Sequence, residues 1–275
     1  MILPKPLVTV AWLAEHLHDA DLVIVDCRFD LGQPDAGRHA YAEGHLPGAV
    51  YFDLDEDLSA PTAAHGGRHP LPEPQVLAQK LGVAGVTPGA QVVVYDNGGQ
   101  YAARCWWLLR WLGHDDVAVL DGGFQVWQAA GHPVTDAPSQ PEARTFVPHP
   151  RSDMTALMTE VRTRPDDVVV VDARAAERFA GQASSLDPKG GHIPGAVNRP
   201  WQESLNPDGT WRTPVELAAR FKDLPEPGQQ IHSCGSGVTA CANLLAMEIA
   251  GLNGARLYPG SWSDWCSYDD NPVAK

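Results

Sequence analysis

The sequence predicts an α/β fold made of two similar domains in tandem, each a mostly parallel sheet flanked by helices. Two observations support this prediction. A set of motifs occurs twice in the chain, and short apolar runs alternate with segments of helical periodicity. Both features are typical of domains in which helices connect parallel strands.

The repeated motifs keep the same order and spacing. The run Leu-Val-Ile-Val-Asp-Cys-Arg at 22–28 recurs as Val-Val-Val-Val-Asp-Ala-Arg at 168–174, and Gly-His-Leu-Pro-Gly-Ala-Val at 44–50 recurs with Ile for Leu at 191–197. Each half therefore has the size of one domain. We predict domains at 1–137 and 154–275, joined by a linker at 138–153 in a stretch rich in Pro, Ser, Thr and Gln.

Strands and helices are expected where the patterning changes. Brief β-branched runs bounded by Gly, Pro or Asp predict buried parallel strands. They lie at 22–26, 91–95, 117–120, 168–172, 229–233 and 255–258. Apolar residues at helical spacing predict the helices. These lie at 74–82, 100–112, 214–222 and 238–250.

Composition narrows the classes of function. The 275-residue chain has a formal net charge of −14, which argues against general binding to nucleic acid, because that needs a basic surface. No apolar run is long enough to span a membrane, and the first residues lack the pattern of a signal peptide. We expect a cytoplasmic protein without a membrane or nucleic-acid partner. No motif for a metal or a cofactor is present.

Cys234 is the strongest candidate for a reactive residue. The chain has five cysteines and no Cys-x-x-Cys pair, a pattern that fits neither a disulfide framework nor a zinc site. Cys234 begins the run Cys-Gly-Ser-Gly-Val-Thr between an apolar strand and an apolar helix. Backbone N–H groups and the positive dipole end at a helix entrance favour a thiolate, and glycines allow several N–H groups to point at one sulfur. The alternative is a buried, inert cysteine.

Together, the repeated Asp-x-Arg and Gly-His-x-Pro-Gly-Ala motifs and this cysteine loop resemble those of two-domain rhodanese-type sulfurtransferases. The resemblance covers nearly the whole chain and is greatest to the 3-mercaptopyruvate sulfurtransferases. Where the second half has Cys234, the first half has Asp96, which cannot carry sulfur. The resemblance therefore implies a catalytically silent first domain. His45 and His192 belong to motifs in both halves, so we expect them to hold a turn.

The resemblance implies sulfur transfer in two stages. The Cys234 thiolate takes sulfur from 3-mercaptopyruvate, which leaves a persulfide and releases pyruvate. A thiol such as thioredoxin, or cyanide, then accepts the outer sulfur. The loop residues expected to bind the substrate are Gly235, Gly237, Val238 and Thr239. Thr239 is also expected to cap the following helix or to bond the loop.

The resemblance also implies a Ser-His-Asp relay beside the cysteine. Ser236 supplies the hydroxyl. His69 and Asp55, from the first half of the chain, are the best matches for the other two members. His65 and Asp53 are their nearest rivals, and a solvated loop histidine with ordinary turn carboxylates is the alternative.

Arg178 matches the arginine that binds the substrate carboxylate in this family, since a guanidinium can hold a carboxylate by two parallel hydrogen bonds. A surface ion pair with a nearby Glu is the alternative. In mercaptopyruvate enzymes a second arginine often follows, but the stretch 181–189 has none. Lys189 could substitute in part. The preferred donor therefore stays open.

Three other functions fit the sequence less well. Thiosulfate is the rival donor, although the neutral residues Gly235 and Ser236 after the cysteine favour mercaptopyruvate over this dianion. A cysteine phosphatase would need an arginine at position 240, where this chain has Ala240. A passive persulfide carrier would not need Ser236, His69 or Arg178. A sulfurtransferase is therefore the preferred function.

Overall fold

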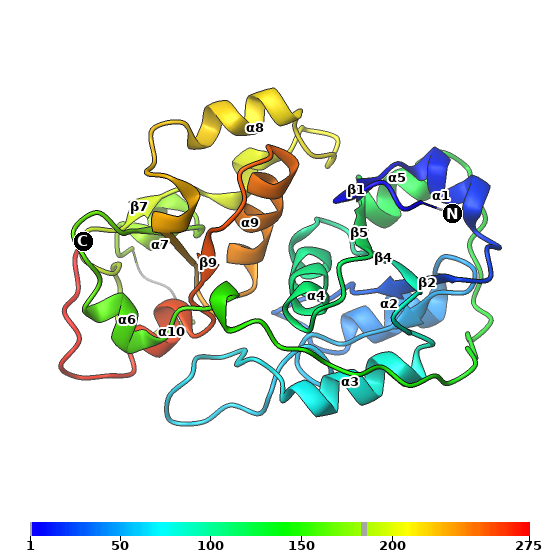
Figure 1. Cartoon of the computed structure of the whole chain (residues 1–275), viewed down its shortest axis with the longest axis horizontal. Helices are drawn as coiled ribbons and strands as arrows, with labels where there is room; N and C mark the ends of the chain where they lie inside the picture. Colours follow the sequence, from blue (N-terminus) through cyan, green and yellow to red (C-terminus); the bar gives the residue numbers. More distant parts are fainter. Residues whose placement is uncertain (1, 183–185) are drawn as a thin grey trace. The chain divides into compact units, whose positions relative to one another are not determined.

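The computed structural model describes residues 2–182 and 186–275, and its chain forms two compact units (Figure 1). The first unit contains Met1–Ala60, Pro72–Arg151 and Pro207–Trp211. The second contains Pro61–Leu71, Ser152–Asn206 and Arg212–Lys275. Each unit therefore consists of several separate segments, and dividing the chain at one position would not separate the two units.

The first unit is built on a parallel sheet with strand order β1-β5-β4-β2-β3. The strands are β1 (Leu7–Val8), β2 (Leu22–Asp26), β3 (Val50–Tyr51), β4 (Gln91–Tyr95) and β5 (Val117–Leu120). The helices are α1 (Val10–His16), α2 (Ala36–Glu43), α3 (Pro74–Val83), α4 (Gln100–Trp111) and α5 (Gly123–Ala129). The interior strands β4 and β5 are almost wholly buried, as expected for a parallel sheet covered on both faces.

The second unit has a parallel sheet with strand order β7-β6-β8-β9. Its strands are β6 (Val169–Asp172), β7 (Val197–Asn198), β8 (Gln230–Ser233) and β9 (Arg256–Leu257). Its α-helices are α6 (Met158–Arg162), α7 (Ala176–Phe179), α8 (Pro214–Phe221), α9 (Thr239–Ile249) and α10 (Ser261–Trp265), and its 3₁₀ turns are η1 (Ser152–Met154), η2 (Trp201–Ser204) and η3 (Pro227–Gln229).

The predicted fold class and all the predicted elements are confirmed. The six expected strands are β2, β4, β5, β6, β8 and β9, and the four expected helices are α3, α4, α8 and α9. Helix α8 begins where Thr213 and Glu216 form a capping box and Pro214 occupies the first turn. Within the described residues no helix is both long and apolar enough to cross a membrane.

The repeated Asp-x-Arg motif stabilises the same turn in both units. In the second unit, Arg174 binds Asp172 with a shortest distance of 2.7 Å and donates to the Gly191 carbonyl at 2.8 Å. Arg28 and Asp26 repeat this arrangement in the first unit. Both ion pairs are buried. These arginines are therefore part of the framework, because each neutralises a carboxylate and satisfies a turn carbonyl.

The two repeated histidines also have matching surroundings. His45 Nδ1 lies 2.7 Å from the Tyr41 carbonyl, and its ring stacks on that of Tyr41. His192 Nδ1 lies 2.9 Å from the Phe179 carbonyl, and its ring stacks on that of Phe179. This geometry fits the predicted role of both histidines in holding a turn.

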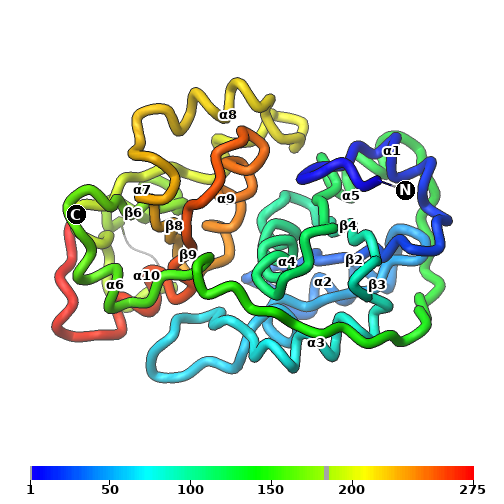
Figure 2. Tube along the Cα trace, viewed as in Figure 1, coloured from blue at the N-terminus to red at the C-terminus, as the bar shows by residue number. Residues whose placement is uncertain are grey.

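The segment 61–71, here called the 61–71 loop, packs against α10 within the second unit. It is the light blue loop that precedes α3 in Figure 2. Gly66 N donates to Asp264 Oδ1 at 2.7 Å, and Arg68 N donates to Ser263 Oγ at 3.1 Å. A Cβ on Gly67 would lie 2.5 Å from the Gly260 carbonyl oxygen. Only glycine allows this close approach, which brings the next residues toward the cysteine loop.

Candidate functional site

Cys234 lies where interior strand β8 ends, and α9 begins five residues later, at Thr239. Its side chain is buried, and Gly237 N donates to its sulfur at 3.1 Å. Gly237 has φ +79°, and a Cβ there would lie 2.2 Å from the Pro259 carbonyl oxygen. The loop therefore requires glycine at this position, both for its backbone conformation and for space.

Ser261 contacts the backbone and the sulfur of Cys234. It has φ +54°, an uncommon conformation for a residue with a side chain. Its hydroxyl accepts from Cys234 N at 3.0 Å and donates to the Tyr258 carbonyl at 2.9 Å, while the Cys234 sulfur is 4.0 Å away. Since a hydroxyl has one proton, this serine fixes the backbone of Cys234 more than it solvates the sulfur.

Ser236 and His69 are in direct contact. The Ser236 hydroxyl oxygen lies 2.7 Å from His69 Nδ1, and both residues are buried. The 61–71 loop, which belongs to the same unit as Cys234, positions this histidine. His65 is exposed, stacks on Tyr268 and hydrogen-bonds the Ser267 hydroxyl. The geometry thus distinguishes the two histidines that the sequence left as rivals.

Asp55 and its rival Asp53 lie in the first unit. Asp53 is buried, and its carboxylate accepts hydrogen bonds from Asp55 N at 2.8 Å, Glu56 N at 3.2 Å and the Tyr51 hydroxyl at 3.1 Å. These contacts give Asp53 a local role in the turn. Burial raises the pKa of Asp55, and the neighbouring charges of Asp53 and Glu56 raise it further. Asp55 as the third member of the relay stays a prediction.

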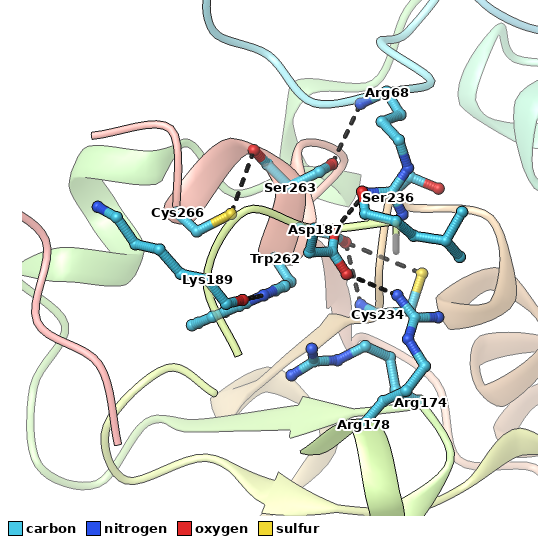
Figure 3. A network of polar contacts seen from close by, with 12 residues as sticks. Arg68, Arg174, Arg178, Asp187, Lys189, Cys234, Ser236, Trp262, Ser263 and Cys266 are labelled. Carbon is cyan, nitrogen blue, oxygen red and sulfur yellow. Dashed lines mark hydrogen bonds and ion pairs between the residues drawn. The ribbon is translucent and has the colours of Figure 1, made fainter. Parts of the chain in front are cut away.

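Arg178 and Arg68 bind the same carboxylate beside the cysteine loop (Figure 3). Arg178 Nη2 lies 2.7 Å from Asp187 Oδ2, and Arg68 Nη1 pairs with Asp187 Oδ1. The alternative for Arg178 was an ion pair with Glu, but its partner is this aspartate. Arg68 and Asp187 did not emerge from the sequence as site residues, since they lie 119 positions apart.

Lys189 has other contacts. Its ammonium group donates to the Tyr268 carbonyl at 3.1 Å and lies 3.7 Å from Asp269 Oδ1. The cation that pairs with Asp187 alongside Arg178 is therefore Arg68. Three residues of the stretch without arginine, 183–185, lie outside the described residues.

The other predicted residues of the cysteine loop are Gly235, Val238 and Thr239. Val238 is buried and occupies the N-cap position of α9, whereas Thr239 is the first helical residue. Thr239 is therefore not at the N-cap position, and no described side chain caps this helix; its alternative role of bonding the loop stays a prediction. Gly235 faces both arginines: a Cβ there would lie 3.0 Å from Arg68 Nη2 and 3.1 Å from Arg178 Nη2. Among the described residues no group of three or more His, Cys, Asp or Glu could hold a metal ion.

The corresponding loop of the first unit is filled by Asp96. Its carboxylate accepts four backbone N–H groups at the start of α4, which belong to Gly98, Gly99, Tyr101 and Ala102. Burial raises the pKa of Asp96, and the four hydrogen bonds offset part of this rise. A strand-to-helix loop of this kind therefore surrounds an acidic group with donors, which is the property expected around a thiolate or a persulfide.

The fold and the loop are those of an α/β protein with a cysteine at the carboxyl end of an interior strand. The model of the rhodanese-like domain matches residues 9–130 and 157–268. The chain belongs to the rhodanese-like family.

Several relatives match nearly the whole length of the chain. A probable 3-mercaptopyruvate sulfurtransferase of Pseudomonas aeruginosa is 43% identical over 98% of this chain and 97% of its own length. A putative thiosulfate sulfurtransferase of Mycobacterium tuberculosis is 38% identical over 98% and 96%. The crystal structure of a 3-mercaptopyruvate sulfurtransferase of Escherichia coli matches with a TM-score of 0.83 and 35% identity, over 94% of this chain and all of that one. The prediction of a rhodanese-type sulfurtransferase is confirmed.

Proposed function

We propose that this protein moves sulfur from 3-mercaptopyruvate to a thiol or to cyanide, through a persulfide on Cys234. The observation that carries the proposal is the grouping of Cys234, the Ser236–His69 hydrogen bond and two arginines within one unit. These residues supply a nucleophile, a proton path and cations for a small anionic donor. The names of the relatives support the same donor.

In the first step, the Cys234 thiolate attacks the thiol sulfur of the donor. The new S–S bond forms as the C–S bond breaks, and the electron pair of that bond passes to carbon to give the enolate of pyruvate. A proton on this carbon completes pyruvate, and the enzyme is left as Cys234-S-SH. The donated hydrogen bond from Gly237 N stabilises negative charge on the sulfur.

Ser236 and His69 are the proposed proton path of that step. The hydroxyl delivers a proton to the enolate carbon, and the imidazole replaces it through the 2.7 Å hydrogen bond. Asp55 is proposed as the group that orients His69.

In the second step, an acceptor thiolate attacks the outer sulfur of the persulfide. The S–S bond of the enzyme breaks, the acceptor becomes a persulfide, and the Cys234 thiolate returns. Cyanide would leave as thiocyanate. Thioredoxin as the thiol acceptor and a cytoplasmic location complete the proposal.

Thiosulfate is the second candidate donor, because a putative thiosulfate sulfurtransferase is among the relatives and two guanidiniums suit a sulfonate-like anion. A comparison of kcat/KM for the two donors separates the candidates. We expect the larger value for 3-mercaptopyruvate. A larger value for thiosulfate would reverse the assignment of the donor.

The persulfide is tested with 3-mercaptopyruvate and no acceptor. We expect pyruvate release and one added sulfur atom on Cys234 by peptide mass spectrometry. Cys234→Ser should give neither product. Cys266→Ser, which changes another buried cysteine of the same unit, is the matched control and should behave as the wild type. Undiminished pyruvate release by Cys234→Ser would contradict the proposed function.

A further inference from the structure

One carboxylate, that of Asp187, bridges two guanidiniums beside the cysteine loop. Its side chain is 2% exposed, whereas those of Arg68 and Arg178 are each 29% exposed. Each oxygen of Asp187 pairs with a different arginine, and Arg68 Nη1 also donates to the Leu186 carbonyl at 3.0 Å. The two cations are thus held together by a buried anion that belongs to the protein.

Both guanidiniums reach the residue next to the nucleophile. Gly235 has no Cβ, but a Cβ placed on it would lie 3.0 Å from Arg68 Nη2 and 3.1 Å from Arg178 Nη2. The Nε of Arg178 is buried and has no hydrogen-bond partner among the described residues. A buried donor without a partner is costly. The pair therefore has one buried donor, Arg178 Nε, that no described residue satisfies; Figure 3 shows the two arginines in the same network as Cys234.

We propose that Arg68 and Arg178 together bind the carboxylate of the sulfur donor, and that Asp187 occupies this place while no donor is bound. The donor carboxylate replaces that of Asp187 between the two guanidiniums. The exchange conserves charge at the arginines, since one carboxylate substitutes for another. Asp187 therefore acts as a competitor within the protein and weakens the apparent affinity for the donor. This inference rests on the proposed function and adds Arg68 and Asp187 to its site.

The proposal differs in a measurable way from a purely structural role of Asp187. If Asp187 only held the arginines in position, its removal would weaken donor binding. If Asp187 competes, its removal strengthens donor binding, because the two cations are then free for the donor. Asp187→Asn has nearly the same shape and removes only the charge. The sign of its effect on KM thus decides between the two roles.

The experiment measures KM and kcat for 3-mercaptopyruvate in the full-length protein. We expect Asp187→Asn to lower KM about 3- to 10-fold with kcat within a few-fold of the wild type. Arg68→Ala should raise KM about 10- to 100-fold, the range that the loss of a hydrogen bond to a charged group gives. The KM of Arg68→Lys should lie between those of the wild type and Arg68→Ala, because lysine keeps the charge but loses the forked geometry.

Asp270→Asn is the matched control. Asp270 forms an exposed ion pair with Arg162 in the same unit, so this variant changes the net charge equally without touching the site. Its KM should equal that of the wild type. An equal fall in KM for both Asn variants would overturn the role of Asp187 as a competitor.

A second measurement separates binding from catalysis. Calorimetric titration of 3-mercaptopyruvate into Cys234→Ser, with and without each further substitution, reports affinity without turnover. We expect the dissociation constants to follow the KM values. A dissociation constant that rises in Asp187→Asn, or that is unchanged in Arg68→Ala, would overturn the proposal. Wild-type pyruvate release from 3-mercaptopyruvate tests the proposed function separately.

Discussion

Replacing Gly237 by alanine tests how closely the cysteine loop packs against its support. Gly237 has φ +79° and would place a Cβ 2.2 Å from the Pro259 carbonyl oxygen. Gly251, at the opposite end of α9, has φ +75° and nothing within 4 Å of that position. Both substitutions therefore force alanine into a left-handed backbone conformation, but only Gly237→Ala also brings a methyl group against the Pro259 carbonyl oxygen.

The expected magnitudes follow from these two terms. A left-handed conformation costs a residue with a Cβ about 1–2 kcal/mol, so Gly251→Ala should destabilise by about that amount. Forcing an extra methyl group against backbone adds about 1–3 kcal/mol. Gly237→Ala should therefore lose about 2–5 kcal/mol. For a unit of this size the corresponding falls in Tm are roughly 3–8 °C and roughly 6–20 °C.

Calorimetric melting measures both variants, and the sulfur-transfer assay gives a second readout. Gly237→Ala should also lose activity, because the N–H that donates to the Cys234 sulfur must move with the backbone. Gly251→Ala should keep its activity. Equal falls in Tm for the two variants would refute the reasoning, because the close approach to Pro259 would then contribute nothing.

Three further predictions concern the site and the core. Gly235→Ala should raise KM for 3-mercaptopyruvate in steady-state assays at little cost in Tm, because its Cβ would meet only the flexible tips of two arginines. Ser236→Ala should lower kcat with 3-mercaptopyruvate about 10²- to 10⁴-fold, and an unchanged kcat would remove Ser236 from the proton path. Burial and the charge of Arg220 lower the pKa of His232 to about 3, so the unfolded chain binds the proton more readily. Stability should therefore fall by about 2 kcal/mol between pH 7.5 and 5, and urea unfolding of His232→Gln should show a weaker dependence on pH.

Local patterns of apolar residues were sufficient to predict much of the fold from the sequence. The apolar β-branched runs became parallel strands, because such runs are stable only when both faces are covered. Each repeated motif occupies the same place in its unit, as the contacts of Arg174 and Arg28 show. Short elements such as β3 and β7 were not predicted, since two residues carry no periodicity.

The site was only partly predictable, because its members come from distant parts of the chain. Cys234 and Ser236 share one loop with a recognisable sequence. Arg68 and Asp187 are 119 positions apart and show no common pattern. The sequence suggested Lys189 as the second cation because it lies near Arg178 in the chain, but the ammonium group points to the Tyr268 carbonyl instead. The family resemblance indicated His69 of the 61–71 loop as the partner of Ser236, but no local pattern indicated that the preceding residue, Arg68, pairs with Asp187.

Each unit has a buried aspartate whose carboxylate is surrounded by donors, Asp96 in the first unit and Asp187 in the second, but the donors differ in kind. Asp96 accepts four backbone N–H groups, two from the glycines before α4 and two from its first turn, and the latter two cannot turn away without unwinding the helix. Asp187 is held by two side chains whose tips are partly exposed and free to change rotamer. The first carboxylate is therefore a permanent part of a loop that carries no thiol. The second can be exchanged, and it lies in the unit where Cys234 requires an anionic donor.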